Sequence, residues 1–377
     1  MKIGILTLPL HTNYGGILQA YALQTVLQRR GHDVIVFNRN RFIHQSFIRR
    51  SFSFVLFLFR RMLSKGDKKY VNPYKYNSEL WEREQHLMAF IQKNIHTQNI
   101  KQFELDIPKD LEAIIVGSDQ VWRRPYFTGM YNTEIANAFL KFVQNKKIRR
   151  LSYAASFGTD QWEYTNEETK ECAKLLSMFD AVSVREESAI TLCDIKLGRK
   201  DTRCLLDPTM LLTKEDYIKL LENVTTKESA GNLLCYVLDN NENIQVLIDK
   251  IAKEKKLTPF YTNSKIKDVE APQSERIQPP VEQWIRGFYD ADFVVTDSFH
   301  ACVFSIIFGK PFIAIGNKER GITRFESLLS MFSLEKNLIF DIKDYSSTYN
   351  YDISPKVSEL LDKQRVKAYT FLEDNLK

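Results

Sequence analysis

The chain has 377 residues, 44% of them hydrophobic, which is enough for two globular domains that each have their own core. Its formal net charge of +6 comes from scattered lysines and arginines and gives no sign of nucleic-acid binding. The five cysteines form no Cys-x-x-Cys pair, which argues against a disulfide framework or a zinc site. The cysteine pattern favours a reducing compartment, and we expect no metal site. The N-terminus enters a strand directly, and no run of about 18 apolar residues follows, so we expect a cytoplasmic protein.

Apolar, β-branched runs alternate with helical stretches along the chain, which is typical of parallel sheets with crossover helices. Strands are predicted at residues 2–6, 33–37, 113–116, 151–154, 181–184, 233–238, 259–261, 293–296 and 311–315. They fall into two groups, divided by a proline-marked turn near Asp207. The predicted fold class is therefore α/β. We expect a Rossmann-like domain at 1–205, a second at 206–345, and a helical segment at 346–377 that packs back.

The first predicted strand leads into a helix through the run His-Thr-Asn-Tyr-Gly-Gly at residues 11–16. The paired glycines let the backbone approach a ligand closely, and Asn13 suits either a helix cap or a donor to an oxygen-rich group. The run contains no G-x-G-x-x-G, so no nucleotide fingerprint is predicted. The alternative is a tight turn with a glycine at positive φ.

A short apolar run, Phe54 to Phe59, lies between two arginine pairs. It is too short to span a bilayer. It is a candidate for peripheral contact at the inner face of the membrane, with phenylalanines inserted and arginines on anionic head groups. The alternative is a helix or loop that packs on the first domain.

Two further predicted strands end in polar side chains. Asp119, Gln120 and Trp122 follow the strand at 113–116 and offer a carboxylate, an amide and an indole, which is the chemistry that binds a sugar. Asp119 is equally suited to cap a helix. Arg185 follows the strand at 181–184, where its planar guanidinium suits a carboxylate or phosphate, or else forms a surface ion pair.

Asp297, Ser298 and His300 stand where the strand at 293–296 ends and a helix begins. Ligands bind at this edge of open α/β sheets. The helix start has free backbone N–H groups and a positive dipole end, so an anion beside the imidazole is the expected guest. The alternative is that His300 only caps or packs against the helix.

Six sets of residues occur in order along the chain. They are Asn-Tyr-Gly-Gly at 13–16 with Gln-Ala-Tyr-Ala-Leu at 19–23, Gly-Ser-Asp-Gln-Val-Trp at 117–122, Ser-Tyr-Ala-Ala-Ser-Phe-Gly at 152–158, Ser-Val-Arg-Glu-Glu-Ser at 183–188, Asp-Pro-Thr at 207–209, and Thr-Asp-Ser-Phe-His at 296–300 with Phe-Gly-Lys-Pro-Phe at 308–312. Together they resemble the polysaccharide pyruvyl transferase family. The resemblance runs from residue 1 to about 330.

This resemblance implies a two-domain fold like that of GT-B glycosyltransferases, with the donor in the cleft between the domains. It implies transfer of the enolpyruvyl-derived unit of phosphoenolpyruvate to a sugar of a polysaccharide or glycan precursor, commonly as a cyclic ketal. Phosphoenolpyruvate is a substrate here, and no cofactor is expected. We expect His300 to move a proton or balance the leaving phosphate, and Asp119 to act as base for the attacking hydroxyl.

The remaining roles follow from the same resemblance. The residues expected to bind the donor are Arg185, Ser298, His300, Lys310 and Arg324. The residues expected to bind the acceptor are Asn13, Tyr14, Gly15, Gly16, Gln19, Asp119, Gln120 and Trp122.

One position departs from the family pattern, because better-understood members have an arginine two residues before the histidine and this chain has Ser298. A donor-anion contact is therefore missing or replaced, with Lys310, Lys318, Arg320 and Arg324 as the candidates to replace it. Two alternatives stay open: a GT-B glycosyltransferase that uses a nucleotide sugar, and a noncatalytic sugar-binding protein of a polysaccharide assembly complex. A lipid-linked acceptor would also explain the run from Phe54 to Phe59.

Overall fold

The computed structural model describes residues 1–42, 72–144, 147–222, 224–239, 241–266, 268, 270–317 and 321–377. The apolar run from Phe54 to Phe59 lies outside these residues, as do Lys318 and Arg320. Within the described ranges, no helix combines the length and apolar character needed to cross a bilayer.

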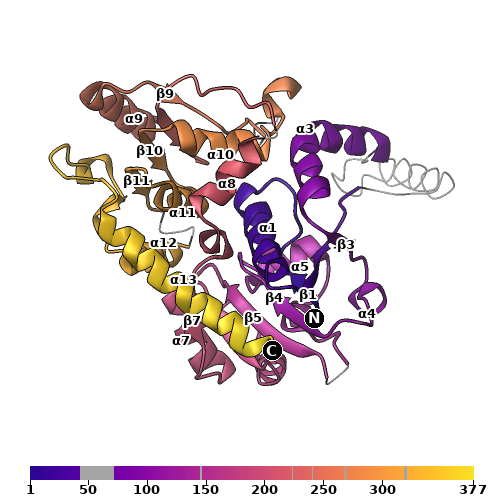
Figure 1. Cartoon of the computed structure of the whole chain (residues 1–377). Helices are drawn as coiled ribbons and strands as arrows, with labels where there is room; N and C mark the ends of the chain where they lie inside the picture. Colours follow the sequence, from indigo (N-terminus) through magenta and orange to yellow (C-terminus); the bar gives the residue numbers. More distant parts are fainter. Residues whose placement is uncertain are drawn as a thin grey trace, which may run out of the picture.

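The described strands form two parallel sheets, and the first has the order β3-β2-β1-β4-β5-β6-β7 (Figure 1). Its strands are β1 (Lys2–Leu6), β2 (Asp33–Asn38), β3 (Thr97–Asn99), β4 (Ala113–Val116), β5 (Arg149–Ala155), β6 (Ala181–Val184) and β7 (Arg203–Cys204). The accompanying helices are α1 (Tyr14–Gln28), α3 (Pro73–Asn94), α4 (Phe103–Asp106), α5 (Arg124–Tyr131), α6 (Asn166–Leu176) and α7 (Glu187–Leu197), with a 3₁₀ turn η1 (Ile135–Phe139).

The second sheet has the order β12-β11-β10-β8-β9. Its strands are β8 (Leu233–Tyr236), β9 (Pro259–Phe260), β10 (Phe293–Thr296), β11 (Phe312–Ile315) and β12 (Leu338–Ile339). The helices here are α8 (Lys214–Glu222), α9 (Glu242–Lys255), α10 (Val281–Asp290), α11 (Phe299–Phe308) and α12 (Thr323–Met331), with 3₁₀ turns η2 (Pro208–Leu211), η3 (Gln273–Arg276), η4 (Glu335–Asn337) and η5 (Ile342–Asp344).

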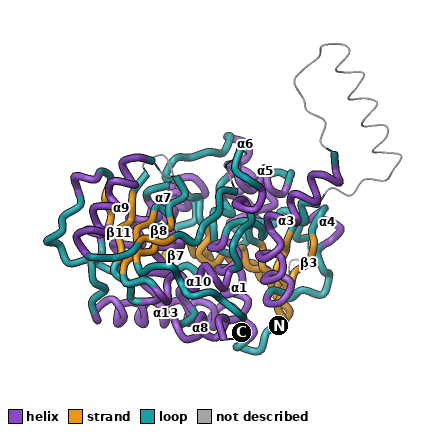
Figure 2. Tube along the Cα trace, turned by 90° about the horizontal axis from the view of Figure 1, so that it is seen from above, coloured by secondary structure: helices purple, strands orange, loops and turns teal. Residues whose placement is uncertain are grey.

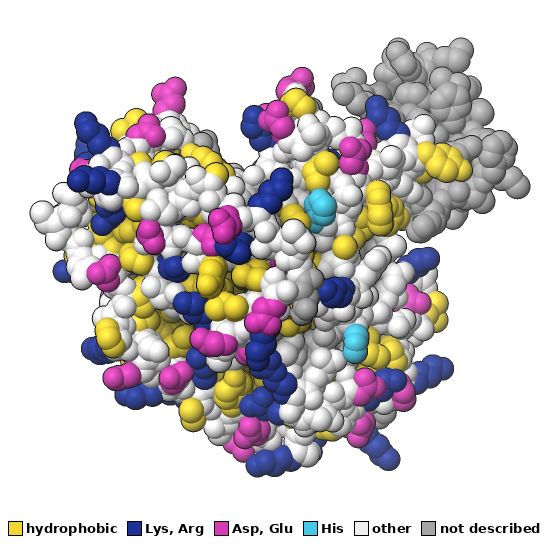
Figure 3. All heavy atoms as spheres, turned by 45° about the horizontal axis from the view of Figure 1, so that its top comes forward, with side chains coloured by type: hydrophobic (Ala, Val, Ile, Leu, Met, Phe, Trp, Pro, Cys, Tyr) yellow, Lys and Arg dark blue, Asp and Glu magenta, His cyan; other side chains and the backbone are white. Residues whose placement is uncertain are grey.

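The central strands are apolar on both faces because helices cover both sides of each sheet (Figure 2). Every residue of β4 and of β10 is buried, for example. These two parallel sheets with alternating helices confirm the predicted α/β class with two Rossmann-like halves. The predicted boundary at 205/206 falls between the last strand of the first sheet and the first strand of the second, and the domain limits themselves stay a prediction. On the face shown in Figure 3, basic and acidic side chains are intermixed.

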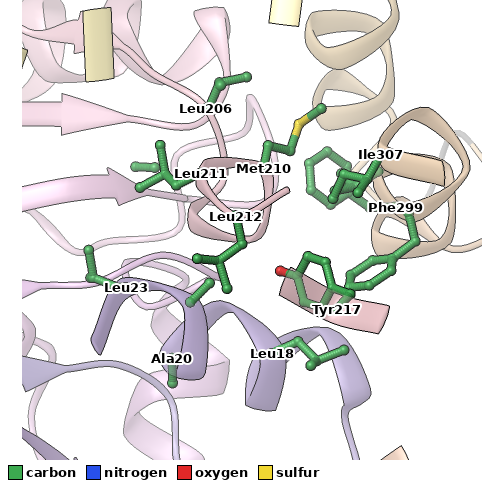
Figure 4. Packing of buried hydrophobic residues seen from close by; sticks show 14 of the residues in the cluster. Leu18, Ala20, Leu23, Leu206, Met210, Leu211, Leu212, Tyr217, Phe299 and Ile307 are labelled. Carbon is green, nitrogen blue, oxygen red and sulfur yellow. The ribbon is translucent and has the colours of Figure 1, made fainter. Parts of the chain in front are cut away.

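One hydrophobic cluster joins the two halves (Figure 4). It contains side chains from α1, from η2, from α8 and from α11. Those labelled in the close-up are Leu18, Ala20, Leu23, Leu206, Met210, Leu211, Leu212, Tyr217, Phe299 and Ile307. Because the same cluster includes residues of both halves, the start of α11 is held against the first sheet.

The last helix, α13 (Pro355–Asn375), runs from the second half back across the first (Figure 1). Its buried Phe371 lies near Tyr153 of β5, with ring centroids 6.4 Å apart. The Arg365 guanidinium donates to the carbonyl oxygens of Met210 and Leu212 at 2.7 and 2.8 Å. The helix therefore covers the first sheet and holds the η2 turn in place.

Candidate functional site

The strand order of the first sheet reverses between β1 and β4, and a small hollow lies at that point. Strands β2 and β3 extend the sheet from β1, whereas β5, β6 and β7 extend it from β4. The loops that leave β1 and β4 therefore diverge, as they do at ligand sites of open α/β sheets. The hollow has a volume of about 70 Å³. The residues that line it include His11, Asn13, Gly16, Asp119, Gln120 and Tyr126.

Asp119 is held with its carboxylate facing this hollow. Its backbone has a φ of 64°, which is unusual for a residue other than glycine and costs on the order of 1 kcal/mol. The conformation is held by the backbone N–H groups of Val121 and Ser156, which donate to the Asp119 carbonyl at 2.8 and 3.1 Å. Asn13 Nδ2 donates to Asp119 Oδ2 at 3.2 Å. Asn13 and Asp119, both predicted site residues, therefore meet as expected.

Arg185, at the end of β6, forms a buried ion pair with Asp207. Arg185 Nη1 lies 2.8 Å from Asp207 Oδ2, and each side chain is only 1% exposed. Ser118 Oγ donates to the same oxygen at 3.0 Å, and the Thr209 N–H and hydroxyl donate to the other at 3.0 and 2.7 Å. This network fixes the Asp207 carboxylate between two loops of the first sheet.

Both partners of this pair stay charged. Burial by itself raises the pKa of Asp207, but His300 and Arg185 outweigh it and bring the pKa well below its usual range. Burial lowers the pKa of Arg185, but Asp207, Asp119 and Glu186 together raise it above its ordinary value. Arg185 Nη2 is 3.7 Å from Asp119 Oδ1. Neither Nε nor Nη2 of Arg185 has a hydrogen-bond acceptor among the described residues.

His300 reaches this cluster from the first turn of α11. Its Nε2 is 3.5 Å from Asp207 Oδ2, which is within ion-pair distance. Nε2 forms no hydrogen bond to the described residues. The His300 ring lies directly against Gly15, where an added Cβ would overlap the imidazole. Gly15 was predicted to approach a ligand, and the structure corrects this, because its close neighbour is His300.

Arg324, at the start of α12, completes the cationic side of the cluster. The guanidinium carbons of Arg185 and Arg324 lie 4.5 and 5.7 Å from the centroid of the Phe299 ring. Such contacts stabilise cations over an aromatic face. Burial, followed by repulsion from Arg185, lowers the pKa of Arg324 to about 10, although the residue keeps part of its surface exposed. The structure thus brings the predicted donor residues Arg185, His300 and Arg324 together.

Ser298 also lies beside this cluster, as predicted, at the N-cap position of α11. Its backbone N–H donates to Thr296 Oγ1 at 2.9 Å. Its hydroxyl makes no capping hydrogen bond to the described residues. His300 is the second residue of α11, in the first turn of the helix, where backbone N–H groups have no partner within the helix.

Two residues of this cluster were not predicted as site residues. Glu186 Oε1 accepts hydrogen bonds from Ser156 Oγ and from the N–H groups of Phe157 and Gly158, at 2.9, 3.0 and 3.2 Å. Asp207 was interpreted only as a turn and a family motif. The signal that would have found both is position, because each follows a strand of the first sheet at its carboxyl end, as Asp119 and Arg185 do.

Two aromatic residues predicted to bind the acceptor have structural roles instead. Trp122 is fully buried, its ring stacks on Phe139 at 5.0 Å, and its Nε1 donates to the Ala138 carbonyl. Tyr14 stacks on Trp284 of α10 at 5.4 Å, and its hydroxyl donates to the Pro279 carbonyl at 2.8 Å. Their faces are covered by protein, so neither ring is available to a sugar.

Gln19 and Lys310 are also placed away from their predicted roles. Gln19 is fully buried, and its Nε2 donates to Thr7 Oγ1 and the Gly16 carbonyl, both at 2.9 Å. Lys310 donates to the Tyr289 carbonyl and follows the far end of α11. That helix has 10 residues, so Lys310 lies roughly 15 Å from the His300 end. Gln120 and Gly16 do line the hollow beside Asp119.

A larger hollow of about 450 Å³ lies at the corresponding reversal of the second sheet, between β8 and β10. Three carboxylates, those of Asp239, Asp297 and Asp341, line it together with the amides of Asn241, Asn243 and Asn317. Its described lining contains no cation to receive an anionic donor. Among the described residues, no group of three or more His, Cys, Asp or Glu side chains is arranged to hold a metal ion.

The two Rossmann-like halves bring titratable side chains together where they face each other. Residues 13–319 match the family model described as polysaccharide pyruvyl transferase. The chain therefore belongs to the polysaccharide pyruvyl transferase family, which confirms the resemblance found in the sequence.

Solved structures similar to this chain include sugar-active enzymes at low identity. UDP-GlcNAc 2-epimerase from Neisseria meningitidis is 10% identical, with 97% of this chain and 100% of that chain covered and a TM-score of 0.43. The glycotransferase of kitacinnamycin is 12% identical, with 100% and 99% covered and a TM-score of 0.41. Sucrose-phosphate synthase from Thermosynechococcus elongatus is 12% identical, with 99% and 98% covered and a TM-score of 0.42. No curated protein sequence matches the chain.

Proposed function

We propose that the protein transfers the enolpyruvyl-derived group of phosphoenolpyruvate to a sugar of a glycan and closes it as a cyclic ketal. The observation that carries this proposal is the pair of arginines, Arg185 and Arg324, on the ring of Phe299 beside His300. Phosphoenolpyruvate has a phosphate and a carboxylate, so it needs two cationic partners close together. Family membership supports the same reaction.

In this proposal Arg324 takes the place of the arginine that the family pattern has at Ser298. Arg185 offers its Nε and Nη2 groups, which have no acceptor among the described residues, and Arg324 supplies the second guanidinium. The start of α11, where His300 lies, has the positive end of the helix dipole and favours a phosphate. An anion bound here relieves the repulsion between the two arginines.

The donor site is closed in this conformation. The side chains of Arg185 and Asp207 are 1% exposed and that of His300 is 8% exposed. Donor entry therefore requires α11 and α12 to move away from the first sheet. Closure around the donor then excludes water from a reaction in which hydrolysis competes.

The acceptor hydroxyl enters at the hollow beside Asp119. Asp119 takes the proton of the first hydroxyl as its oxygen attacks C2 of phosphoenolpyruvate, and His300 as imidazolium gives a proton to C3, which becomes a methyl group. The C2–O bond to phosphate then breaks, which leaves an oxocarbenium ion. A second hydroxyl adds to C2, and its proton leaves with the phosphate. The proton that Asp119 took returns to His300 through solvent when the products leave, which restores both groups. Asn13 and Gln120 hold the sugar beside Asp119.

The first test is ligand-induced thermal stabilisation of the purified protein with phosphoenolpyruvate and, separately, with UDP. Phosphoenolpyruvate at 100 times its Kd adds about 2.7 kcal/mol of stability. We expect Arg324→Met to remove this shift. Lys310→Met is the matched control, since Lys310 lies at the far end of α11, and should keep the shift.

A shift with UDP alone would contradict the proposal and move the donor to a nucleotide sugar. If Arg324→Met is still stabilised against thermal unfolding by phosphoenolpyruvate, Arg324 does not bind the donor. A positive result leads to a phosphate-release assay with phosphoenolpyruvate and a panel of sugar acceptors.

A further inference from the structure

A second hollow adjoins the one beside Asp119. It has a volume of about 210 Å³ and lies between the carboxyl ends of β2 and β3 and the helix α3. Leu10 and His11 line both hollows, so the two are neighbours on either side of the loop after β1. The described residues that line the outer hollow include none of those that the predicted site included.

The inner hollow is too small to hold a whole acceptor. Its volume of about 70 Å³ is well below the range of about 300–1,000 Å³ found for small-molecule sites. Only the edge of a sugar that carries the reacting hydroxyls fits beside Asp119. The rest of the acceptor extends out of the inner hollow, and the outer hollow adjoins it across Leu10 and His11.

The lining of the outer hollow is that of a site for a neutral polyol. The amides of Asn38, Asn40, Gln92 and Asn99 surround an apolar floor that includes Leu80 and Ile91. The Oδ1 atoms of Asn38, Asn40 and Asn99 accept backbone N–H groups, so these side chains offer their NH2 groups to hydroxyls. An apolar floor suits the C–H face of a sugar ring.

The two arginines of this lining are already occupied. Arg41 pairs with the buried carboxylate of Glu84. Arg39 donates to the carbonyl oxygens of Lys101 and Tyr131. The Arg41 charge is therefore balanced by Glu84, and the Arg39 guanidinium is directed to carbonyl oxygens of the protein and not into the hollow. This arrangement favours a neutral ligand over a phosphate.

His11 connects the two hollows and is set to donate to a hydroxyl. Its Nδ1 accepts the backbone N–H of Thr12 at 2.9 Å, which places the proton of the neutral ring on Nε2. Burial, followed by repulsion from Arg41, lowers the pKa of His11 to about 4, so the ring is neutral near pH 7. A neutral donor is the group expected between two sugar positions.

We propose that the outer hollow is a second sugar subsite, so that the acceptor is a glycan of at least two sugar units and not a free monosaccharide. This inference rests on the proposed function, because it assumes that the reacting sugar lies beside Asp119. The sugar next to the reacting one then packs on Leu80 and Ile91 and bonds to the surrounding amides.

The test compares acceptor pairs in a phosphate-release assay with phosphoenolpyruvate. The monosaccharide acceptors are the methyl glycosides of glucose, galactose and mannose. The disaccharide acceptors are methyl glycosides whose non-reducing sugar is one of these three. We expect the wild-type kcat/KM for the best disaccharide to exceed that of its monosaccharide by at least about tenfold.

Two variants fill the outer hollow from different elements. Gln92→Trp on α3 and Thr97→Trp on β3 both change exposed residues of its lining, so the fold tolerates them. We expect each to bring the disaccharide-to-monosaccharide ratio of kcat/KM close to one. Gln85→Trp is the matched control, because Gln85 lies two turns away on α3 and lines neither hollow, and it should keep the ratio.

Equal use of the monosaccharide and disaccharide by the wild type would overturn the inference while the proposed function stands. A preference for the disaccharide that both filling variants keep would also overturn it. The same holds for a preference for a sugar 1-phosphate over the disaccharide. If no phosphate is released with any acceptor, the proposed function fails. Saturation-transfer NMR with the same sugars then tests whether the outer hollow binds a sugar. Disaccharide binding to the wild type that both Gln92→Trp and Thr97→Trp lose would support the second subsite. Absence of disaccharide binding to the wild type would overturn it.

Discussion

At the scale of single residues, Asp207 is the centre of the site. Its two carboxylate oxygens accept from Ser118, Thr209 and Arg185, and His300 approaches one of them. The residue links the end of the first sheet to the first turn of α11. It touches no bound molecule in the proposed scheme and acts by positioning Arg185 and His300.

We expect Asp207→Asn to destabilise the protein by about 3–5 kcal/mol, because it leaves the buried Arg185 charge without its carboxylate. Urea denaturation at pH 7 measures this. Asp201→Asn is the control, since the Asp201 carboxylate is 70% exposed and its pair with Arg199 is worth less than about 1 kcal/mol.

The same comparison has a pH dependence. The pKa of Asp207 in the folded state is below its unfolded value of about 3.9, so its contribution is fully present above that pH and is lost as the pH falls further. The difference between wild type and Asp207→Asn should stay constant from pH 7 to about 5 and shrink only below about pH 4. Equal stability of the two proteins at pH 7 would contradict the central role of the pair.

At the scale of elements, the start of α1 determines how closely the two halves approach. Gly15 is the second residue of this helix, and the His300 ring of α11 lies directly over it. The turn after β1 therefore has no room for a side chain at this position, although alanine is the better helix former.

Gly15→Ala should lower stability and abolish pyruvyl transfer, because the added methyl group displaces His300 from Asp207. Helix propensity alone would favour the change by roughly 1 kcal/mol, so a loss of stability isolates the clash. Gly129→Ala, in α5, adds the same methyl group where nothing lies within 4 Å and should stabilise or leave stability unchanged. Thermal unfolding of both variants measures the difference, and similar behaviour of the two would refute the clash.

The sequence predicts the elements of the sheets better than it predicts which side chains face a ligand. The buried strands β1, β4, β6 and β10 have the predicted bounds, because continuous apolar runs between turn signals are distinctive. The strands β3, β7 and β12 were missed. They have two or three residues each and lie at sheet edges, so they carry no apolar run long enough to predict a strand.

The site was predicted in part. Position after a strand identified Asp119, Arg185 and His300, because carboxyl ends of parallel strands meet at one edge. Trp122 and Tyr14 were assigned to the acceptor site because the sequence alone does not distinguish an aromatic residue of the core from one that binds a sugar. Only the partners Phe139 and Trp284, distant in sequence, decide between the two.

At the scale of the whole molecule, Tyr14 is one of the contacts that hold the two halves together. Its hydroxyl donates to the Pro279 carbonyl at 2.8 Å and lies 3.1 Å from Gln278 Oε1, across the boundary between the halves. The ring stacks on Trp284 at an angle of 8°. The opening that the proposed function requires would have to break or bend these contacts.

We expect Tyr14→Phe to cost about 1 kcal/mol, since it removes the donor to the half-buried Pro279 carbonyl while the ring stacking stays. Hydrogen exchange should become faster at the start of α10, measured by mass spectrometry. Tyr289→Phe changes an exposed hydroxyl on the same helix and should leave exchange unchanged. Unchanged exchange in Tyr14→Phe would show that the hydroxyl does not restrain the opening.

The path of α13 also sets an order of folding during synthesis. The first sheet is complete once β7 has been made, yet the surface of β5 near Tyr153 stays uncovered until Phe371 leaves the ribosome. At about 5–20 residues per second, this takes on the order of ten to thirty seconds. Until then the nascent chain exposes an apolar face, and we expect a chain truncated before α13 to be less soluble than the full chain.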